Sequence, residues 1–123
     1  MRDYKKYEVW VKSHELVLMI YKEVIPSIPD SEKYGLCSQL RRAAYSIPMN
    51  IAEGCGRTSD TEFCRFLTIS LGSANETEYC LILLNDLRYI DKGLFEKANA
   101  LLIEIKYKLI NLIKAIRKTN AKA

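Results

Sequence analysis

The sequence has 123 residues, 49% of them hydrophobic and 28% charged, which suits one domain with one core and excludes a disordered chain. Only five glycines and three prolines are present, too few for the many turns of an all-β fold. The formal net charge of +4 is compatible with a nucleic-acid partner but does not by itself indicate one. The first residues lack the apolar run of a signal peptide, and no run of about 18 apolar residues predicts a membrane span. We therefore expect a cytoplasmic protein.

Four segments carry apolar side chains at helical spacing. The first predicted helix covers residues 9–25 and ends before "PSIPD", because proline cannot continue a helix. The second begins near Asp30 or Ser31, both favourable N-cap residues, and ends at Gly54 and Gly56.

The third and fourth predicted helices begin at residues that favour helix caps. Ser59 and Glu62 have the spacing of a capping box, and this helix extends to about Arg88. The fourth helix begins after Asp91, which is predicted as its N-cap. Four amphipathic helices joined by short connections predict an all-α fold, an antiparallel up-down-up-down four-helix bundle that forms a single domain over residues 1–123.

Pro48 lies inside the second predicted helix, within "LRRAAYSIPMNIAEGCGR" (residues 40–57). An interior proline removes one backbone hydrogen bond and clashes with the preceding turn, at a cost of about 3 kcal/mol. The apolar spacing nevertheless continues from Ile47 to Ile51, which favours one helix kinked at Pro48. The alternative is a break, with Pro48 at the first position of a new helix.

The predicted outer faces of the second and third helices are not uniformly polar. Gly72 is the clearest case, because glycine in a helix interior costs up to about 1 kcal/mol relative to alanine. It would let another backbone approach closely, although a tolerated surface glycine is the alternative. Apolar stripes on neighbouring helices favour an interface between copies of the chain. The residues predicted to form this oligomer interface are Arg42, Tyr45, Met49, Gly72, Tyr79 and Leu83.

Basic residues are predicted to gather at one end of the bundle, which we call the basic pole. The start of the first helix, the connection between the second and third, and the end of the fourth meet there in this topology. The basic residues of these segments are Arg2, Lys5, Lys6, Arg57, Lys114, Arg117, Lys118 and Lys122. One interpretation is a solvated end, with cations placed favourably at a helix C-terminus. The other is a phosphate-binding surface, whose candidate residues are Lys5, Lys6, Arg57, Lys114, Arg117 and Lys118.

The sequence lacks the side-chain patterns of catalysis and metal binding. His14 is the one histidine, so no Glu-x-x-His pairs indicate a di-iron site. The cysteines at positions 37, 55, 64 and 80 form no Cys-x-x-Cys pair, so we expect reduced thiols and no metal or cofactor. Glu76 and Glu78 lie on different sides of the third helix. One or both are expected to meet Arg41 or Arg42 across the bundle. No enzymatic activity is predicted.

Two stretches of the chain resemble a known family. "SQLRRAAYSIPMNIAEGCGR" (residues 38–57) and "EFCRFLTISLGSANETEY" (residues 62–79) resemble the four-helix-bundle family of 23S rRNA intervening-sequence proteins, also called ribosomal-protein-like. "YEVWVKSHELVLMIYK" in the first predicted helix extends the resemblance over most of the chain, and in the fourth helix only the apolar rhythm matches. The family motif corresponds here to Leu40, Arg41, Arg42, Ala43, Ser46, Ile47, Pro48, Asn50, Ile51, Ala52, Glu53, Gly54 and Arg57.

The resemblance implies a homopentameric barrel of four-helix bundles. Related accessory variability proteins of diversity-generating retroelements are basic and bind nucleic acid and a reverse transcriptase, which implies RNA, DNA or such a protein as partner. We expect an oligomer that binds nucleic acid, RNA rather than DNA, through the basic pole. The alternative is a protein-interaction scaffold without affinity for nucleic acid. Arg57 is the better candidate for a ligand contact, whereas Arg41 and Arg42 are expected to be structural or interfacial.

Overall fold

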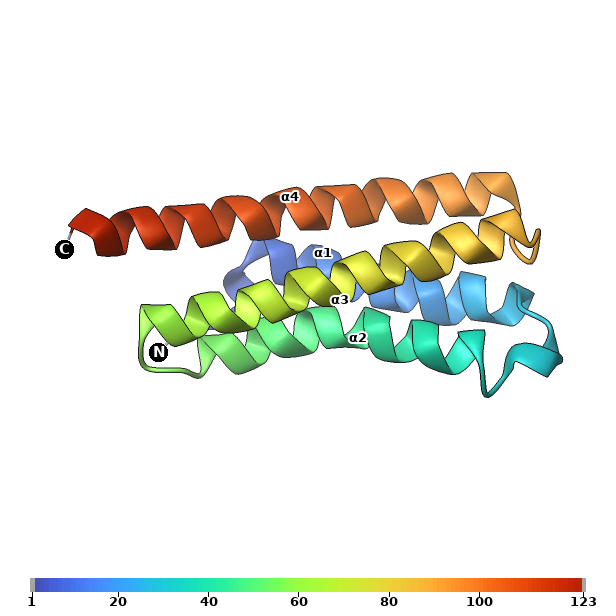
Figure 1. The fold of residues 1–123 in the computed structure, drawn as a ribbon, viewed down its shortest axis with the longest axis horizontal. Helices are drawn as coiled ribbons and strands as arrows, with labels where there is room; N and C mark the ends of the chain where they lie inside the picture. Colours follow the sequence, from blue (N-terminus) through green and yellow to red (C-terminus); the bar gives the residue numbers. More distant parts are fainter. Residues whose placement is uncertain (1, 123) are drawn as a thin grey trace.

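The computed structural model describes residues 2–122 of the chain and the side chains of residues 2–119. Its long helices are α1 (Glu8–Met19), α2 (Leu36–Cys55), α3 (Asp60–Asp86) and α4 (Lys92–Lys122), and the described residues contain no strand. Successive helices run antiparallel, each packs on its neighbour in the chain, and α4 closes the bundle against α1 (Figure 1). The all-α, up-down-up-down four-helix bundle predicted from the sequence is confirmed.

The segment between α1 and α2 contains most of the irregular helical geometry. α1 continues directly into a π-helical turn, η2 (Ile20–Val24), and then a 3-10 turn, η3 (Ile25–Ser27). The first predicted helix is therefore confirmed in extent, and both ends of η2 remain buried in the core. A further 3-10 turn, η4 (Asp30–Glu32), follows, and another, η1 (Tyr4–Lys6), precedes α1.

The prediction that α2 begins near Asp30 or Ser31 is wrong. These residues belong to the separate turn η4, and α2 starts at Leu36, after Gly35, whose ψ of -106° is not helical. Glycine loses more conformational entropy in a helix than any other residue, so the helix forms beyond it. At its other end α2 closes at Cys55, between the two glycines that were expected to end it.

α2 runs through Pro48 without interruption, which excludes a break at this residue. The Ser46 hydroxyl donates to the carbonyl oxygen one turn earlier at 2.6 Å, and the Asn50 amide donates to the carbonyl oxygen of Ser46 at 2.8 Å. From α3, the buried Ser70 hydroxyl donates to the carbonyl oxygen of Ile47 at 2.8 Å. These bonds stabilise the helix around the proline and attach it to α3. A kink at Pro48 stays a prediction.

The predicted N-caps of α3 and α4 are confirmed. The Ser59 hydroxyl accepts a hydrogen bond from the backbone N–H of Glu62 at 3.1 Å. The Glu62 carboxylate accepts from Arg65 instead of from the Ser59 N–H, so only one half of the predicted capping box forms. A carboxylate oxygen of Asp91 accepts one from the backbone N–H of Leu94 at 2.8 Å. Each bond satisfies one of the N–H groups that a helix leaves free in its first turn. The two caps therefore fix where the long helices of the second half begin.

The C-terminal end of α3 depends on a residue with left-handed backbone geometry. α3 ends at Asp86, close to the predicted end at about Arg88. Arg88 has a φ of 60°, in the region that glycine occupies at less cost than other residues. Beyond it, the backbone N–H of Tyr89 donates to the carbonyl oxygen of Leu84 at 2.9 Å. This bond satisfies a carbonyl group at the helix end, and it does so at the cost of strain in Arg88.

The core is formed by apolar side chains from all four helices. The largest fully buried ones are Leu16, Ile20, Leu40, Ile47, Ile51, Phe63, Leu67, Leu81, Leu84, Leu102, Ile105 and Leu109. α3 packs tightly on α2 at Gly54, where an added Cβ atom would lie 2.9 Å from the Cβ of Phe66 and 3.1 Å from Cδ1 of Phe63. Gly54 thus lies inside α2 instead of ending it, and its missing side chain lets the two phenylalanines pack.

Candidate nucleic-acid interface

The fold brings the segments of the predicted basic pole to one end of the bundle. Figure 1 shows the start of the chain, the α2–α3 connection and the end of α4 at this end, with the last turns of α4 extending beyond the connection. The candidate phosphate contacts are Lys5 and Lys6 in η1, Arg57 in the α2–α3 connection, and Lys114, Arg117 and Lys118 in the last turns of α4.

Arg2 attaches the segment before α1 (residues 2–7), which we call the N-terminal arm, to the α2–α3 connection. Its guanidinium donates to the backbone carbonyl oxygen of Arg57 at 2.7 Å and to a carboxylate oxygen of Asp60 at 2.5 Å. The same group lies 4.3 Å from the centre of the Phe63 ring. Arg2 therefore supports the shape of the pole, and its charge is largely committed to Asp60. Local sequence spacing carries no signal for this contact, because the partners are 58 positions apart.

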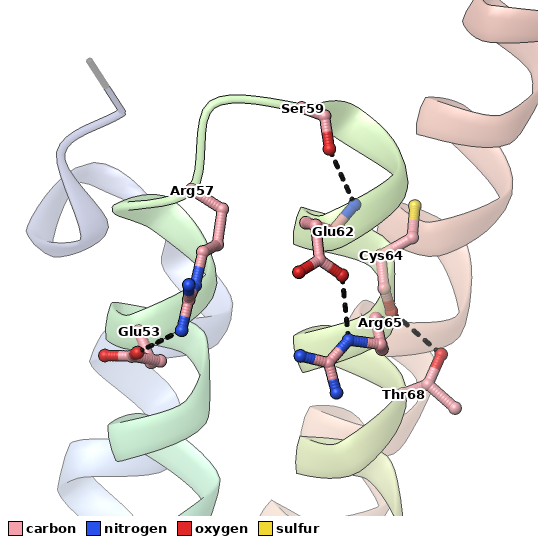
Figure 2. Close-up of polar contacts among 7 residues, drawn as sticks. All are labelled: Glu53, Arg57, Ser59, Glu62, Cys64, Arg65 and Thr68. Carbon is pink, nitrogen blue, oxygen red and sulfur yellow. Dashed lines mark hydrogen bonds and ion pairs between the residues drawn. The ribbon is translucent and has the colours of Figure 1, made fainter.

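Arg57 is also neutralised within the protein, which weakens it as a phosphate contact. Its guanidinium donates to Glu53 at 2.7 Å (Figure 2), and it lies 4.7 Å from the centre of the Phe66 ring. Arg65 lies 4.6 Å from the same ring centre and donates to Glu62 at 2.8 Å. The hydrogen bond from Arg65 holds the pKa of Glu62 below its ordinary value. Two arginine–glutamate pairs therefore flank one aromatic ring on the outer face of α2 and α3.

The remaining candidate phosphate contacts are not neutralised by ion pairs. All are exposed, and none has an acidic partner among the side chains of residues 2–119. They are Lys5, Lys6, Lys114, Arg117 and Lys118. The side chain of Lys122, also predicted for the pole, lies outside the described residues.

Ion pairs neutralise lysines along the face between α1 and α4. Lys97 lies 3.3 Å from Glu23, and Lys108 lies 3.2 Å from Glu8. These pairs are solvent-exposed and individually contribute little stability. They do, however, leave this face without the excess positive charge that the basic pole carries, so the pole is the better candidate for contacts with phosphate.

The residues predicted for the oligomer interface lie on the outer faces of α2 and α3. Tyr79 is 63% exposed, Met49 59% and Tyr45 38%. Gly72 is exposed, and an added Cβ atom there would meet no atom within 4 Å, so packing within the monomer does not require glycine. The remaining two residues are Arg42, which is exposed, and Leu83, which is half-buried.

The predicted ion pairs between Glu76 or Glu78 and the adjacent arginines of α2 are wrong. Glu78 lies 3.1 Å from Lys106 of α4, and no ion pair involves Glu76, Arg41 or Arg42 among the side chains of residues 2–119. Glu78 follows the buried Ala74 by one turn and lies on the flank of α3 that faces α4, which explains its partner.

The cysteines are free and buried, and burial raises the pKa of each thiol. His14 stacks on Trp10, with ring centres 5.2 Å apart and planes inclined by 8°. Among the described residues, no three His, Cys, Asp or Glu side chains are grouped so as to hold a metal ion. The helices of residues 2–122 include none with the length and apolarity needed to cross a membrane.

These observations define the chain as a four-helix bundle with a basic pole whose cations are largely uncompensated. A family model described as 23S rRNA-intervening sequence protein matches residues 5–111, and the chain belongs to this family. It is similar to a protein of unknown function from the S23 ribosomal protein family of Bacteroides thetaiotaomicron VPI-5482, known from a crystal structure. The two are 34% identical, with a TM-score of 0.79 over 86% of this chain and 98% of that one. A comparison with curated proteins finds no match.

Proposed function

We propose that the protein is a non-enzymatic homo-oligomer that binds nucleic acid, RNA in preference to DNA, through the basic pole. The observation that carries this proposal is the set of exposed cations without ion pairs in η1 and in the last turns of α4, at one end of the bundle. Cations that contact phosphates release condensed counterions, so the affinity would fall steeply as salt is raised. The preference for RNA rests on the family to which the chain belongs.

A salt series with a charge-reversed variant tests the basic pole. The variant replaces Lys114, Arg117 and Lys118 by glutamate. Its affinity for structured RNA should fall, and the slope of log K against log salt should flatten by about 0.7–0.9 for each phosphate group that the variant no longer binds. If both the affinity and the slope are unchanged, the basic pole is not the surface that contacts the phosphates.

The matched control applies the same change of charge at the opposite end of the bundle. It replaces Lys22, Lys33 and Lys92, which are exposed and have no ion pair among the side chains of residues 2–119. This variant should keep most of its affinity, because η2, the segment before α2 and the start of α4, which carry the reversed residues, lie at the end of the bundle opposite the pole (Figure 1). An equal loss in both variants would mean that net charge alone governs binding.

We propose further that copies of the chain assemble through the outer faces of α2 and α3, with five subunits as the resemblance implies. Gly72 supports this, because glycine there costs helix stability and serves no packing within the monomer. Gly72→Arg should therefore lower the solution mass measured by light scattering. Gly93→Arg, the same substitution at the exposed start of α4, should not. An unaltered mass in Gly72→Arg would count against this interface.

A protein-interaction scaffold is the second candidate function. It is favoured by the outer face of α4, where Ile103 is 42% and Tyr107 65% exposed, and where both line a groove of about 320 Å³. Recovery of a protein partner that resists nuclease, combined with no binding to RNA at low salt, would favour this function over the first.

A further inference from the structure

A cleft of about 570 Å³ opens between α3 and α4 beside the basic pole. This volume falls within the range of about 300–1,000 Å³ found for small-ligand sites. The lining residues are Thr61, Cys64, Arg65, Thr68 and Ile69 of α3, and Arg117 of α4. Arg117 belongs both to the cleft and to the candidate phosphate contacts, so it connects this concave site with the charged surface around it.

Arg117 supplies the available positive charge of the cleft. It has no acidic partner among the side chains of residues 2–119. Burial raises the pKa of the Cys64 thiol, and the nearby charge of Arg117 acts in the opposite direction. Arg65 differs, because its guanidinium bonds to Glu62 and lies on Phe66, directed toward α2 (Figure 2). Arg65 therefore forms a rim, and an anion would meet Arg117.

Apolar and hydroxyl groups form the rest of the lining. Ile69 is 40% exposed and gives the cleft its accessible apolar surface, whereas Cys64 is only 6% exposed and lies at the floor. The Thr68 hydroxyl donates to the backbone carbonyl oxygen of Cys64 at 2.9 Å, which leaves the hydroxyl oxygen able to accept a hydrogen bond. Figure 2 shows Cys64 and Thr68 on the side of α3 toward α4. An apolar wall, hydroxyl groups and one guanidinium match the base, the ribose and the phosphate of a nucleotide.

The cleft is concave, so its shape favours a single strand over a duplex. A base inside a duplex is stacked and paired, whereas an unpaired base can be splayed out of its strand. A guanidinium binds a phosphate through two parallel hydrogen bonds. We infer that this cleft holds one nucleotide of a single strand, with the base on Ile69 and the phosphate on Arg117. The inference rests on the proposed function and specifies the form of nucleic acid that the basic pole takes.

Filling the cleft without changing its charge tests the inference. Thr68 is exposed, so Thr68→Trp should fold while its indole occupies the place of the base. Leu18→Trp, at an exposed position of α1 outside both the cleft and the proposed oligomer interface, is the control. Circular dichroism establishes that both variants fold. Fluorescence anisotropy then measures binding of a labelled oligouridylate and of an RNA duplex of the same length.

We expect wild-type protein to bind the oligouridylate more tightly than the duplex. Thr68→Trp should lose about tenfold in affinity for the oligouridylate, because a nucleotide displaced from the cleft also loses its charge-assisted contact with Arg117. It should keep its affinity for the duplex. Leu18→Trp should match the wild type. Arg117→Gln should also bind the oligouridylate less tightly than Lys92→Gln, which removes the same charge at the other end of the bundle.

Failure of the cleft and failure of the proposed function give different results. If both tryptophan variants bind the oligouridylate equally, or if the duplex binds more tightly than the single strand, the cleft is not a nucleotide site. The proposal that the basic pole binds nucleic acid would be unaffected by either result. If wild-type protein binds neither RNA, the proposed function itself is overturned. If uridine monophosphate saturates the protein and the oligouridylate does not bind, the cleft takes a free nucleotide instead of a strand.

Discussion

Replacing Gly54 by alanine tests why a glycine lies inside α2. The added methyl group would stand 2.9 Å from Cβ of Phe66, 3.1 Å from Cδ1 of Phe63 and 3.3 Å from the carbonyl oxygen of Phe63. A Cβ atom and a carbonyl oxygen are fixed to the backbone, so they can move away only if α3 moves. Alanine is therefore expected to force the two helices apart.

The expected loss of stability is the difference between two effects. Overpacking a tight contact costs about 1–3 kcal/mol, and the fixed atoms place this site in the upper half of that range. Against this, alanine gains up to about 1 kcal/mol over glycine in a helix interior. The net destabilisation is about 1–2 kcal/mol. With an unfolding entropy of about 2.1 cal/mol/K per residue, the Tm of a 123-residue chain should fall by about 4–8 °C.

The matched substitution is Gly72→Ala in α3, where no atom lies within 4 Å of the added carbon. Within one subunit only the gain in helix propensity applies there, so the Tm should rise by about 2–4 °C in samples dilute enough that copies of the chain do not assemble. Thermal melts followed by circular dichroism compare both variants with the wild type at one protein concentration, because assembly would make the Tm depend on concentration. A Tm of Gly54→Ala at or above the wild-type value would refute the argument that Phe63 and Phe66 require a glycine.

The remaining predictions concern backbone strain and alkaline pH. Arg88→Gly should raise the Tm by about 4 °C, since glycine relieves about 1 kcal/mol of strain at a φ of 60°, whereas Arg88→Ala keeps the Cβ atom and should bring no gain. Burial raises the pKa values of the thiols, so the unfolded chain releases its thiol protons at a lower pH than the folded protein does. The contribution of the protonated thiols to the free energy of unfolding is therefore complete below the ordinary thiol pKa of 9.0. It is lost as pH rises through the raised pKa values of the folded protein. Urea unfolding from neutral pH to about pH 10 should show this loss, with a smaller slope for Cys80→Ala, and equal slopes in the two proteins would contradict it. The buried thiols are those of Cys37, Cys55, Cys64 and Cys80.

Most of the helical architecture is predictable from the sequence, because apolar spacing and caps are local signals. Ser59 and Asp91 mark the starts of α3 and α4 correctly, since each bonds to a backbone N–H within three residues. The start of α2 is not predictable in this way, because favourable N-cap residues precede Gly35 and the local pattern does not show where the helix begins. The π-helical turn Ile20–Val24 is equally hidden, since buried residues four apart fit an α-helix as well.

The position of the basic pole follows from topology alone, whereas the charge that each residue offers depends on its partners. The Glu53–Arg57 pair has the helical spacing that predicts an ion pair. The bond between Arg2 and Asp60 joins distant parts of the chain and has no such signal. Glu78 shows the same limit, because periodicity identifies the face of a helix on which a residue lies but does not show which neighbouring helix that face meets.

The contacts of Arg2 also have a consequence for the order in which the molecule folds. The hydrogen bond that joins α3 to α2, from Ser70 to Ile47, spans 23 positions, whereas the bond from Arg2 to Asp60 spans 58. Because the entropy cost of closing a loop grows with its length, the α2–α3 hairpin is expected to form first and the N-terminal arm to dock later. Amide hydrogen exchange in the arm should accordingly be faster than in the centre of α2. The end of the bundle proposed to meet nucleic acid is thus the part whose structure is completed late in folding.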